Sequence, residues 1–237
     1  MTPQIGRIHS TIRLDFAARP KVPPRSRSIR LGTLAATLWL LGASYAHACT
    51  IPADIINNIV ETFDEPDDRF ESEFTKVTNG KLRVTPEPDP QTPVTALEPG
   101  SYTDFDACVM VENKEAVFYQ DYKAWGGLAF RGNEEGTDYY AFVVDAKDAF
   151  AVLRFKNDEP TELVGWTKND AVKPVTMLRV VAAKGHVTCF ANDVQVCNLT
   201  IGSGSGSVGF VVWQDQNSGT SFDFDDFVVI DPKASKP

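Results

Sequence analysis

Residues 125–144 carry the side chains best suited to hold a ligand. An apolar run ends at Arg131, an acidic loop follows, and a second apolar run begins at Tyr139. Arg131 beside Asp138 would form an arginine–carboxylate platform for sugar hydroxyls or for a cation. The same spacing fits a second hypothesis, in which residues 133–137 are a hairpin turn and Arg131 pairs with Asp138 across its strands. The sequence leaves both open, and we favour the hairpin.

Aromatic rings form a second group of candidates, because they stack on the C–H faces of sugars. Beyond residue 48 the chain has three tryptophans. Trp166 and Trp213 lie beside polar loops at predicted strand ends, whereas core packing is the alternative for any single ring. The candidate ligand-binding residues are Trp125, Arg131, Asp138, Tyr140, Trp166 and Trp213.

Glycoside hydrolysis requires two carboxyl groups that flank the scissile bond. Acidic pairs occur at Glu71/Glu73, Glu134/Glu135 and Asp223/Asp225. The run ESEFTK has Lys76 where the Glu-x-Asp-x-x-Glu motif of sandwich-fold glucanases ends in glutamate, and no other run fits that motif. We therefore assign no catalytic residue and favour a protein that is not an enzyme.

The segment FDFDDFVVI, residues 222–230, departs from the pattern of a regular strand. Strict alternation would place Asp226 on one face with Phe222 and Phe224. Either a bulge between Asp225 and Asp226 resets the register, or Asp226 is buried with hydrogen bonds or a cation. Calcium takes several oxygen ligands, so Asp225 and Asp226 are candidate ligands of a structural calcium ion. We expect no other cofactor.

All four cysteines follow residue 48. An even count in an exported chain indicates two disulfides, with three connectivities to choose from. Cys189 and Cys197 flank a predicted hairpin whose turn is Asn192-Asp193. A strict two-residue turn puts them one residue out of register, so they face each other only across a bulge or a longer loop. We favour Cys189–Cys197 together with Cys49–Cys108.

The first 48 residues have the pattern of a signal peptide, with a basic part, an apolar run and small residues before the cleavage point. Without them the chain carries 16 basic and 31 acidic residues, a net charge of −15 against −9 for the whole sequence. Such a negative surface excludes nucleic acid as a partner. The signal peptide predicts a periplasmic or extracellular protein that has no membrane span after cleavage.

Strand signals dominate after residue 70. Short apolar runs recur about every 8–12 residues with turns such as Asn79-Gly80 between them, which is typical of an antiparallel sandwich or barrel. Residues 85–99 hold five prolines and are expected to form an exposed loop or connection. The apolar spacing over residues 52–63 is typical of a short helix. We expect a lead-in over 49–69, a sandwich domain over 70–231 and a flexible tail over 232–237.

Four segments in the second half of the chain carry a resemblance to a known group of domains. They are GGLAFRG (126–132), DYYAFVVDAKDAFAVLRF (138–155), LRVVAAKGHVTCFANDVQV (178–196) and GSVGFVVWQDQNSGTSFDFDDFVV (206–229). This order resembles bacterial laminin-G-like, or concanavalin A-like, jelly-roll domains, and distantly the domain called 3-keto-disaccharide hydrolase. The resemblance implies an all-β, antiparallel two-sheet jelly-roll sandwich.

Relatives of this kind include carbohydrate-binding, adhesive and glycan-processing proteins, so the fold does not decide the function. We favour a secreted or periplasmic, non-catalytic module that binds a carbohydrate or another extracellular ligand, such as a glycan or a protein. The alternatives are a hydrolase or lyase acting on glycosides or modified disaccharides, and a structural or adhesive module. Exposed aromatic rings beside hydrogen-bonding groups would favour binding, and two convergent ionisable groups would favour an enzyme.

Overall fold

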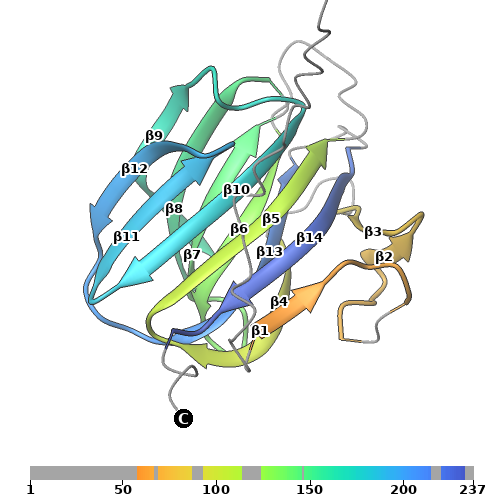
Figure 1. Cartoon of the computed structure of the whole chain (residues 1–237), viewed down its shortest axis with the longest axis horizontal. Coiled ribbons are helices and arrows are strands. Elements are labelled where there is room, and N and C mark those ends of the chain that lie inside the picture. Colours follow the sequence, from red (N-terminus) through yellow and green to blue (C-terminus); the bar gives the residue numbers. More distant parts are fainter. Residues whose placement is uncertain are drawn as a thin grey trace, which may run out of the picture. The chain divides into compact units, whose positions relative to one another are not determined.

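The computed structural model describes residues 58–66, 69–86, 93–113, 124–145, 147–214 and 220–232. All regular structure within these ranges is β-strand, and neighbouring strands are antiparallel (Figure 1). None of the described segments is a helix able to cross a membrane. The predicted all-β class is confirmed, and the predicted signal peptide lies outside the described residues.

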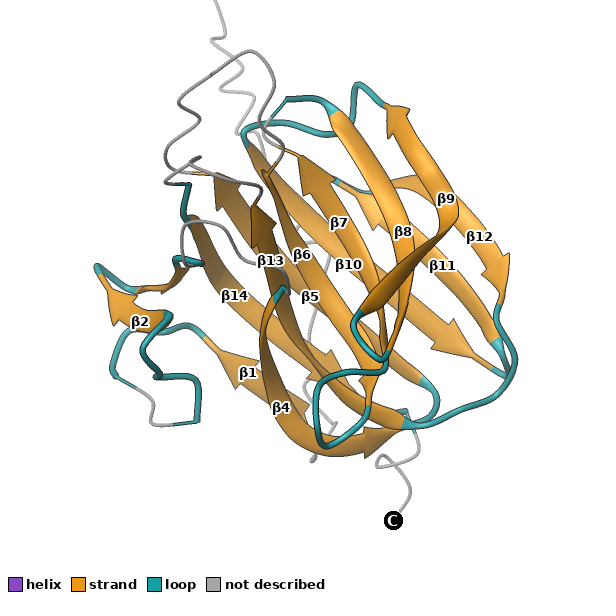
Figure 2. Cartoon of the chain, turned by 180° about the vertical axis from the view of Figure 1, so that it is seen from behind, coloured by secondary structure: helices purple, strands orange, loops and turns teal. Residues whose placement is uncertain are grey.

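The strands form two sheets that pack face to face. One sheet contains β1 (Asn58–Glu61), β2 (Thr75–Thr78), β3 (Lys81–Val84), β5 (Phe105–Asn113), β10 (Val175–Ala183), β11 (His186–Ala191), β12 (Val194–Thr200) and β14 (Phe222–Ile230). Its order is β12-β11-β10-β5-β14-β3-β2, with β1 also paired to β14. The other sheet contains β4 (Val94–Tyr102), β6 (Ala124–Gly132), β7 (Tyr139–Asp145), β8 (Ala149–Lys156), β9 (Glu159–Lys168) and β13 (Gly206–Gln214), in the order β4-β13-β6-β7-β8-β9 (Figure 2).

The main core lies between the two sheets and is rich in phenylalanine. Phe210 of β13 packs against Phe63, Phe70, Phe224 and Phe227, with ring centroids 4.7 to 5.9 Å apart. Buried aromatic pairs of this kind contribute beyond the area that they bury. Phe210 thus joins the six-stranded sheet to β14 of the eight-stranded sheet.

The six-stranded sheet is apolar on its outer face as well. All nine residues of β6 are buried. Leu128 and Phe130 point into the main core, whereas Trp125 and Ala129 belong to a second cluster made only of side chains from this sheet. Because successive side chains of a strand point to opposite faces, the second cluster covers the face turned away from the eight-stranded sheet.

Two-residue turns with positive φ at both positions join several hairpins. Asn79-Gly80 and Asn192-Asp193 are turns as the sequence predicts, Lys184-Gly185 is another, and each pair has φ between 46° and 83°. Asn157-Asp158, with φ values of 51° and 63°, is a further turn of this kind that the sequence reading missed. Such turns match the twist of the flanking strands and fix their register.

The bulge expected in FDFDDFVVI is present. The pairing of β14 with β5 shifts register between Asp225 and Val228, and Asp226 is exposed with φ of 51°. The extra residue returns Phe227 and Val229 to the buried face. A bulge therefore accounts for the broken alternation, and Asp226 is not buried.

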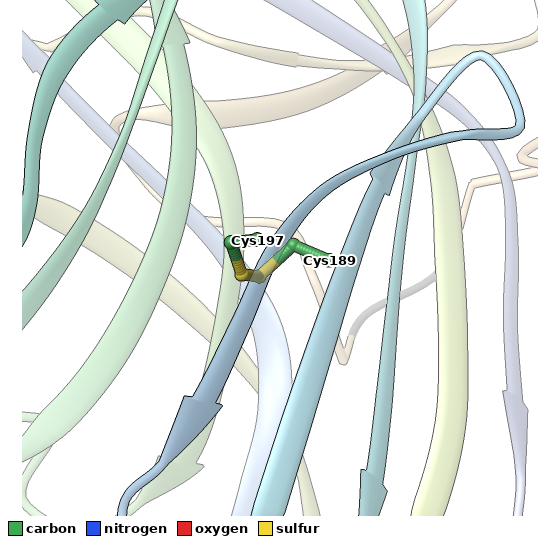
Figure 3. The surroundings of a disulfide bond; sticks show 2 residues. All are labelled: Cys189 and Cys197. Atoms are coloured by element: carbon green, nitrogen blue, oxygen red, sulfur yellow. A yellow bond between two sulfur atoms is a disulfide. The ribbon is translucent and has the colours of Figure 1, made fainter.

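The Cys189–Cys197 disulfide is confirmed (Figure 3). The two residues face each other in β11 and β12, with Cα atoms 4.9 Å apart, and the register shifts between Cys189 and Phe190. This shift is the bulge that the sequence numbering requires. Cys108 is disulfide-bonded. Cys49 lies outside the described residues, so the Cys49–Cys108 pair stays a prediction.

Two predictions about local structure are wrong. A helix was expected over residues 52–63, but residues 58–61 form strand β1 and pair with β14. The helical spacing of apolar residues covers only a short segment, so pairing with a buried strand stabilises the β conformation more. The proline-rich segment 85–99 forms part of β4 from Val94 onward. β4 tolerates Pro99 because it is the edge of its sheet. The expected tail is described only at its first residue, Pro232.

Replacing Phe210 by alanine removes the ring on which four others pack. We expect the free energy of unfolding to fall by about 3–5 kcal/mol, because the lost burial is compounded by a cavity. Urea denaturation measures this change. As a control, Val194→Ala alters a side chain that is 50% exposed on β12 and should cost less than about 1 kcal/mol. Equal losses in the two variants would contradict the role assigned to the phenylalanine cluster.

Candidate ligand-binding site

A pocket of about 370 Å³ opens beside the apolar outer face of the six-stranded sheet. It is called the tryptophan pocket below. Its described lining residues are Pro93, Trp125, Leu153, Phe155, Asp158, Pro160, Glu162, Trp166 and Trp213. All three tryptophans singled out in the sequence therefore line one pocket, together with two carboxylates.

The aromatic side of the pocket is built from paired strands. Trp125 of β6 and Trp213 of β13 are direct register partners, and their rings stack with centroids 5.8 Å apart and planes inclined by 20°. Trp125 also packs on Phe155 of β8 at 6.1 Å. Trp125 is 7% exposed, whereas Trp213 and Trp166 are half-buried. The packing thus fixes Trp125 and leaves the other two tryptophans partly open.

Two register shifts between β8 and β9 place the remaining side chains. Val164 pairs with Val152 and packs on the main core, but Glu162 pairs with Leu153, a residue of the outer cluster. Trp166 also packs on the outer cluster. In a regular strand Glu162, Val164 and Trp166 would share one face. The irregularities on either side of Val164 therefore bring both Glu162 and Trp166 to the pocket.

Asp158 is held in place by its own turn. The Asp158 backbone N–H donates to the Thr137 carbonyl over 3.2 Å, and the Asn157 N–H donates to Asp138 Oδ1 over 2.8 Å. The predicted site residue Asp138 therefore lies outside the tryptophan pocket but secures the turn that carries Asp158. Both contacts anchor the backbone of the β8–β9 turn, which carries Asp158, to the loop after β6.

Glu162 lies against Gly165 on the exposed edge strand β9. A Cβ atom at Gly165 would come within 3.0 Å of Glu162 Oε2, so glycine leaves the space that this side chain occupies. Neither the Glu162 nor the Asp158 carboxylate accepts a hydrogen bond or an ion pair from the part of the chain that the structure describes. Both carboxylates are therefore available to a ligand.

Tyr139 lies beneath the pocket. Its ring stacks on Phe155 with centroids 4.5 Å apart. Burial raises the pKa of the Tyr139 hydroxyl, and the negative charge of Asp158 raises it further. The hydroxyl has no hydrogen-bond partner among the described residues. Tyr139 therefore remains a neutral phenol over the whole physiological pH range.

The predicted Arg131–Asp138 pair is wrong. Arg131 is 8% exposed and its Nη1 donates to the Gly202 carbonyl over 2.7 Å. The register between β6 and β13 shifts at this point, and Arg131 has φ of 54°, which turns the side chain toward the loop before β13. Burial lowers the pKa of the guanidinium group from its usual value. Arg131 thus fastens that loop and does not line the tryptophan pocket.

Tyr140 faces the opposite side of its sheet from the pocket. Its ring stacks on Phe130 of the main core at 5.7 Å, and its hydroxyl accepts a hydrogen bond from Arg154 Nη1 over 2.6 Å.

Of the six candidates, Trp125, Trp166 and Trp213 converge, whereas Arg131, Asp138 and Tyr140 do not join them. Sequence reasoning missed Asp158 and Glu162, although the Asn157-Asp158 turn just ahead of Trp166 was a usable signal.

Asp225 and Asp226 lie away from the tryptophan pocket, at the bulge of β14. Burial raises the pKa of Asp225, while the hydrogen bond that its Oδ1 accepts from the Asp226 N–H, 2.9 Å long, acts in the opposite direction. Within the described ranges no three His, Cys, Asp or Glu side chains gather as a metal site would require. A calcium ion at this position stays an untested alternative, and these two carboxylates supply only part of its usual oxygen shell.

No family model and no curated protein matches the sequence. Several solved structures have a similar fold. The carbohydrate-binding module CBM66 from Bacillus subtilis has a TM-score of 0.52 at 18% identity, over 63% of this chain and 86% of that chain. A functionally unknown protein from Saccharomyces cerevisiae has a TM-score of 0.56 at 11% identity, over 72% of this chain and 98% of that chain.

A xylan β-1,4-xylosidase from Bacillus halodurans C-125 has a TM-score of 0.50 at 12% identity, over 72% of this chain and 38% of that chain. This chain therefore corresponds to only a part of that enzyme. At such identities the likeness establishes the fold alone, which is the predicted concanavalin A-like jelly-roll sandwich. The relation to the 3-keto-disaccharide hydrolase domain stays a prediction.

Thermal melts with and without EDTA test the calcium ion. We expect EDTA to leave the midpoint of thermal unfolding unchanged. Asp226 is exposed at the bulge, so its charge is solvated and no cation is needed to offset a buried charge. The Asp225→Asn/Asp226→Asn double variant, also melted with and without EDTA, serves as a control for non-specific effects of the chelator. A midpoint that EDTA lowers by several degrees in the parent protein but not in this variant would establish calcium at this bulge.

Proposed function

We propose that this chain is an exported, non-catalytic carbohydrate-binding module whose ligand occupies the tryptophan pocket. The observation that carries the proposal is the convergence of Trp125, Trp166 and Trp213 with two carboxylates that have no partner among the described residues. Indole faces cover the apolar C–H surfaces of a sugar, and carboxylates accept hydrogen bonds from its hydroxyls. This combination is what carbohydrate recognition needs.

The size of the pocket agrees with a small ligand. Ligand pockets measure about 300–1,000 Å³, and the 370 Å³ tryptophan pocket is at the lower end of that range. Such a space accepts the end or a short segment of a glycan. The fold supports the same proposal, since one protein of similar architecture is named as a carbohydrate-binding module.

Export is part of the proposal. The Cys189–Cys197 disulfide suits an oxidising compartment, where such bonds form and persist. The signal-peptide pattern of residues 1–48 and the excess of acidic residues beyond it agree with a periplasmic or extracellular protein. A glycan or a surface protein is the partner expected in that location.

A glycoside hydrolase is the second candidate, because Asp158 and Glu162 are two carboxylates in one pocket. The predicted likeness to the 3-keto-disaccharide hydrolase domain agrees with it. Against it, both carboxylates belong to the β8–β9 hairpin. They approach a ligand from one edge of the pocket, whereas hydrolysis requires groups that flank the bond. A structural or adhesive module would need no such pocket.

Replacing Trp166 or Trp213 by alanine tests the binding function. A glycan array first identifies a ligand, and calorimetry then measures its dissociation constant. We expect each variant to bind about tenfold more weakly or worse, because it loses a stacking face worth about 0.5–1.5 kcal/mol and the apolar area buried under it. Both side chains are half-buried, so the fold should survive the change.

The matched control is Leu163→Ala, which changes a neighbour of Trp166 that is 38% exposed and does not line the pocket. It should bind the ligand as the parent protein does. Retention of no glycan on the array would overturn the proposal. Turnover of a glycoside that disappears in Asp158→Asn would replace it with the hydrolase.

A further inference from the structure

The carboxylates of Asp158 and Glu162 differ from three acidic side chains on the strands of the eight-stranded sheet. Asp106, Asp223 and Glu112 each bind a basic side chain at 2.6 to 3.0 Å. Asp158 and Glu162 have no such partner within the described residues. Their negative charges therefore contribute no ion pair to folding and remain directed at whatever enters the pocket.

The pocket contains no described group that would neutralise these charges. Among its described lining residues no side chain is basic. Lys168, two residues beyond Trp166 on β9, is paired with Asp148, with Nζ and Oδ2 3.0 Å apart. A ligand in the pocket thus meets two carboxylates and three indole rings.

Indole faces and carboxylates both attract positive charge. The face of a tryptophan ring is the strongest of the aromatic faces in attracting a cation. A nearby carboxylate adds a direct Coulomb attraction, which grows as water is displaced. An anionic group such as a uronate or a sulfate would instead lose its hydration without gaining a partner.

We propose that the tryptophan pocket recognises an ammonium group carried on a sugar-sized body, with the carboxylates of Asp158 and Glu162 next to the charge. This inference rests on the proposed function and narrows its ligand class. Two kinds of compound carry such an ammonium group, namely the amino-sugar units of a glycan and small quaternary ammonium compounds such as choline. The rings of Trp166 and Trp213 then cover the apolar part of the ligand.

Fluorescence titration measures the charge preference directly, because three of the four tryptophans of the chain line the pocket. The probes are β-1,4-linked glucosamine oligomers, the same oligomers fully N-acetylated, oligogalacturonate and choline, all at pH 6. We expect the glucosamine oligomer to bind about tenfold more tightly than its acetylated form, which has lost the charge. Oligogalacturonate should not bind, and added salt should weaken the binding of glucosamine oligomers.

Charge-neutral variants assign the preference to the two carboxylates. Asp158→Asn and Glu162→Gln keep the shape of each side chain, and each should weaken glucosamine binding about tenfold while leaving the acetylated oligomer unaffected. Glu134→Gln is the matched control, since Glu134 is an exposed acid of the β6–β7 loop outside the pocket. It should bind every probe as the parent does, and equal melting temperatures verify that all variants are folded.

The outcomes separate this inference from the function on which it rests. Equal affinity for the charged and acetylated oligomers, or parent-like glucosamine binding by both pocket variants, would overturn the inference and leave the glycan-binding function standing. Choline binding that depends on Asp158 or Glu162, without binding of any glycan, would support the inference and identify the small cation as the ligand. If none of the four probes binds, the ammonium preference is wrong, and the glycan array alone then decides the broader function.

Discussion

The two-sided burial of the six-stranded sheet is the constraint from which the site follows. Its strand β6 is buried along its whole length, so side chains on both faces must pack. Only one face can meet the other sheet, and the aromatic cluster around Trp125 covers the second. Since each large ring buries about 150–250 Å², that cluster stabilises the strands and at the same time supplies the wall of a pocket. Trp125 serves both purposes.

Irregular pairing determines which side chains reach that wall. A perfectly regular β9 would send Val164 and Trp166 to the same face, and only the register shifts against β8 separate them. A bulge likewise turns Arg131 away from Asp138 and under the loop before β13. Bulges bend an antiparallel strand locally and redirect individual side chains. The candidate site is thus a product of local exceptions to the alternation that builds the fold.

The contrast between regular alternation and local register shifts explains what the sequence could predict. Alternating apolar runs and turns such as Asn192-Asp193 are local signals, so the strands, the sandwich and the Cys189–Cys197 bridge were predictable. The bulge at Asp226 was predictable too, because its own strand breaks alternation. Arg131 could not be placed, since its bulge depends on pairing with β13, about 75 residues later in the chain. For the same reason the approach of Asp158 to three tryptophans was not visible.

The outer faces of the two sheets differ in chemistry. On the eight-stranded sheet, acids such as Asp223 and Asp106 are paired with arginines on neighbouring strands. These pairs leave little net charge on that face. On the six-stranded sheet, aromatic rings form an outer cluster, and the carboxylates of Asp158 and Glu162 at its border have no ion pair among the described residues. At the tryptophan pocket, the charges of Asp158 and Glu162 thus lie beside apolar rings, where a bound cation would neutralise them.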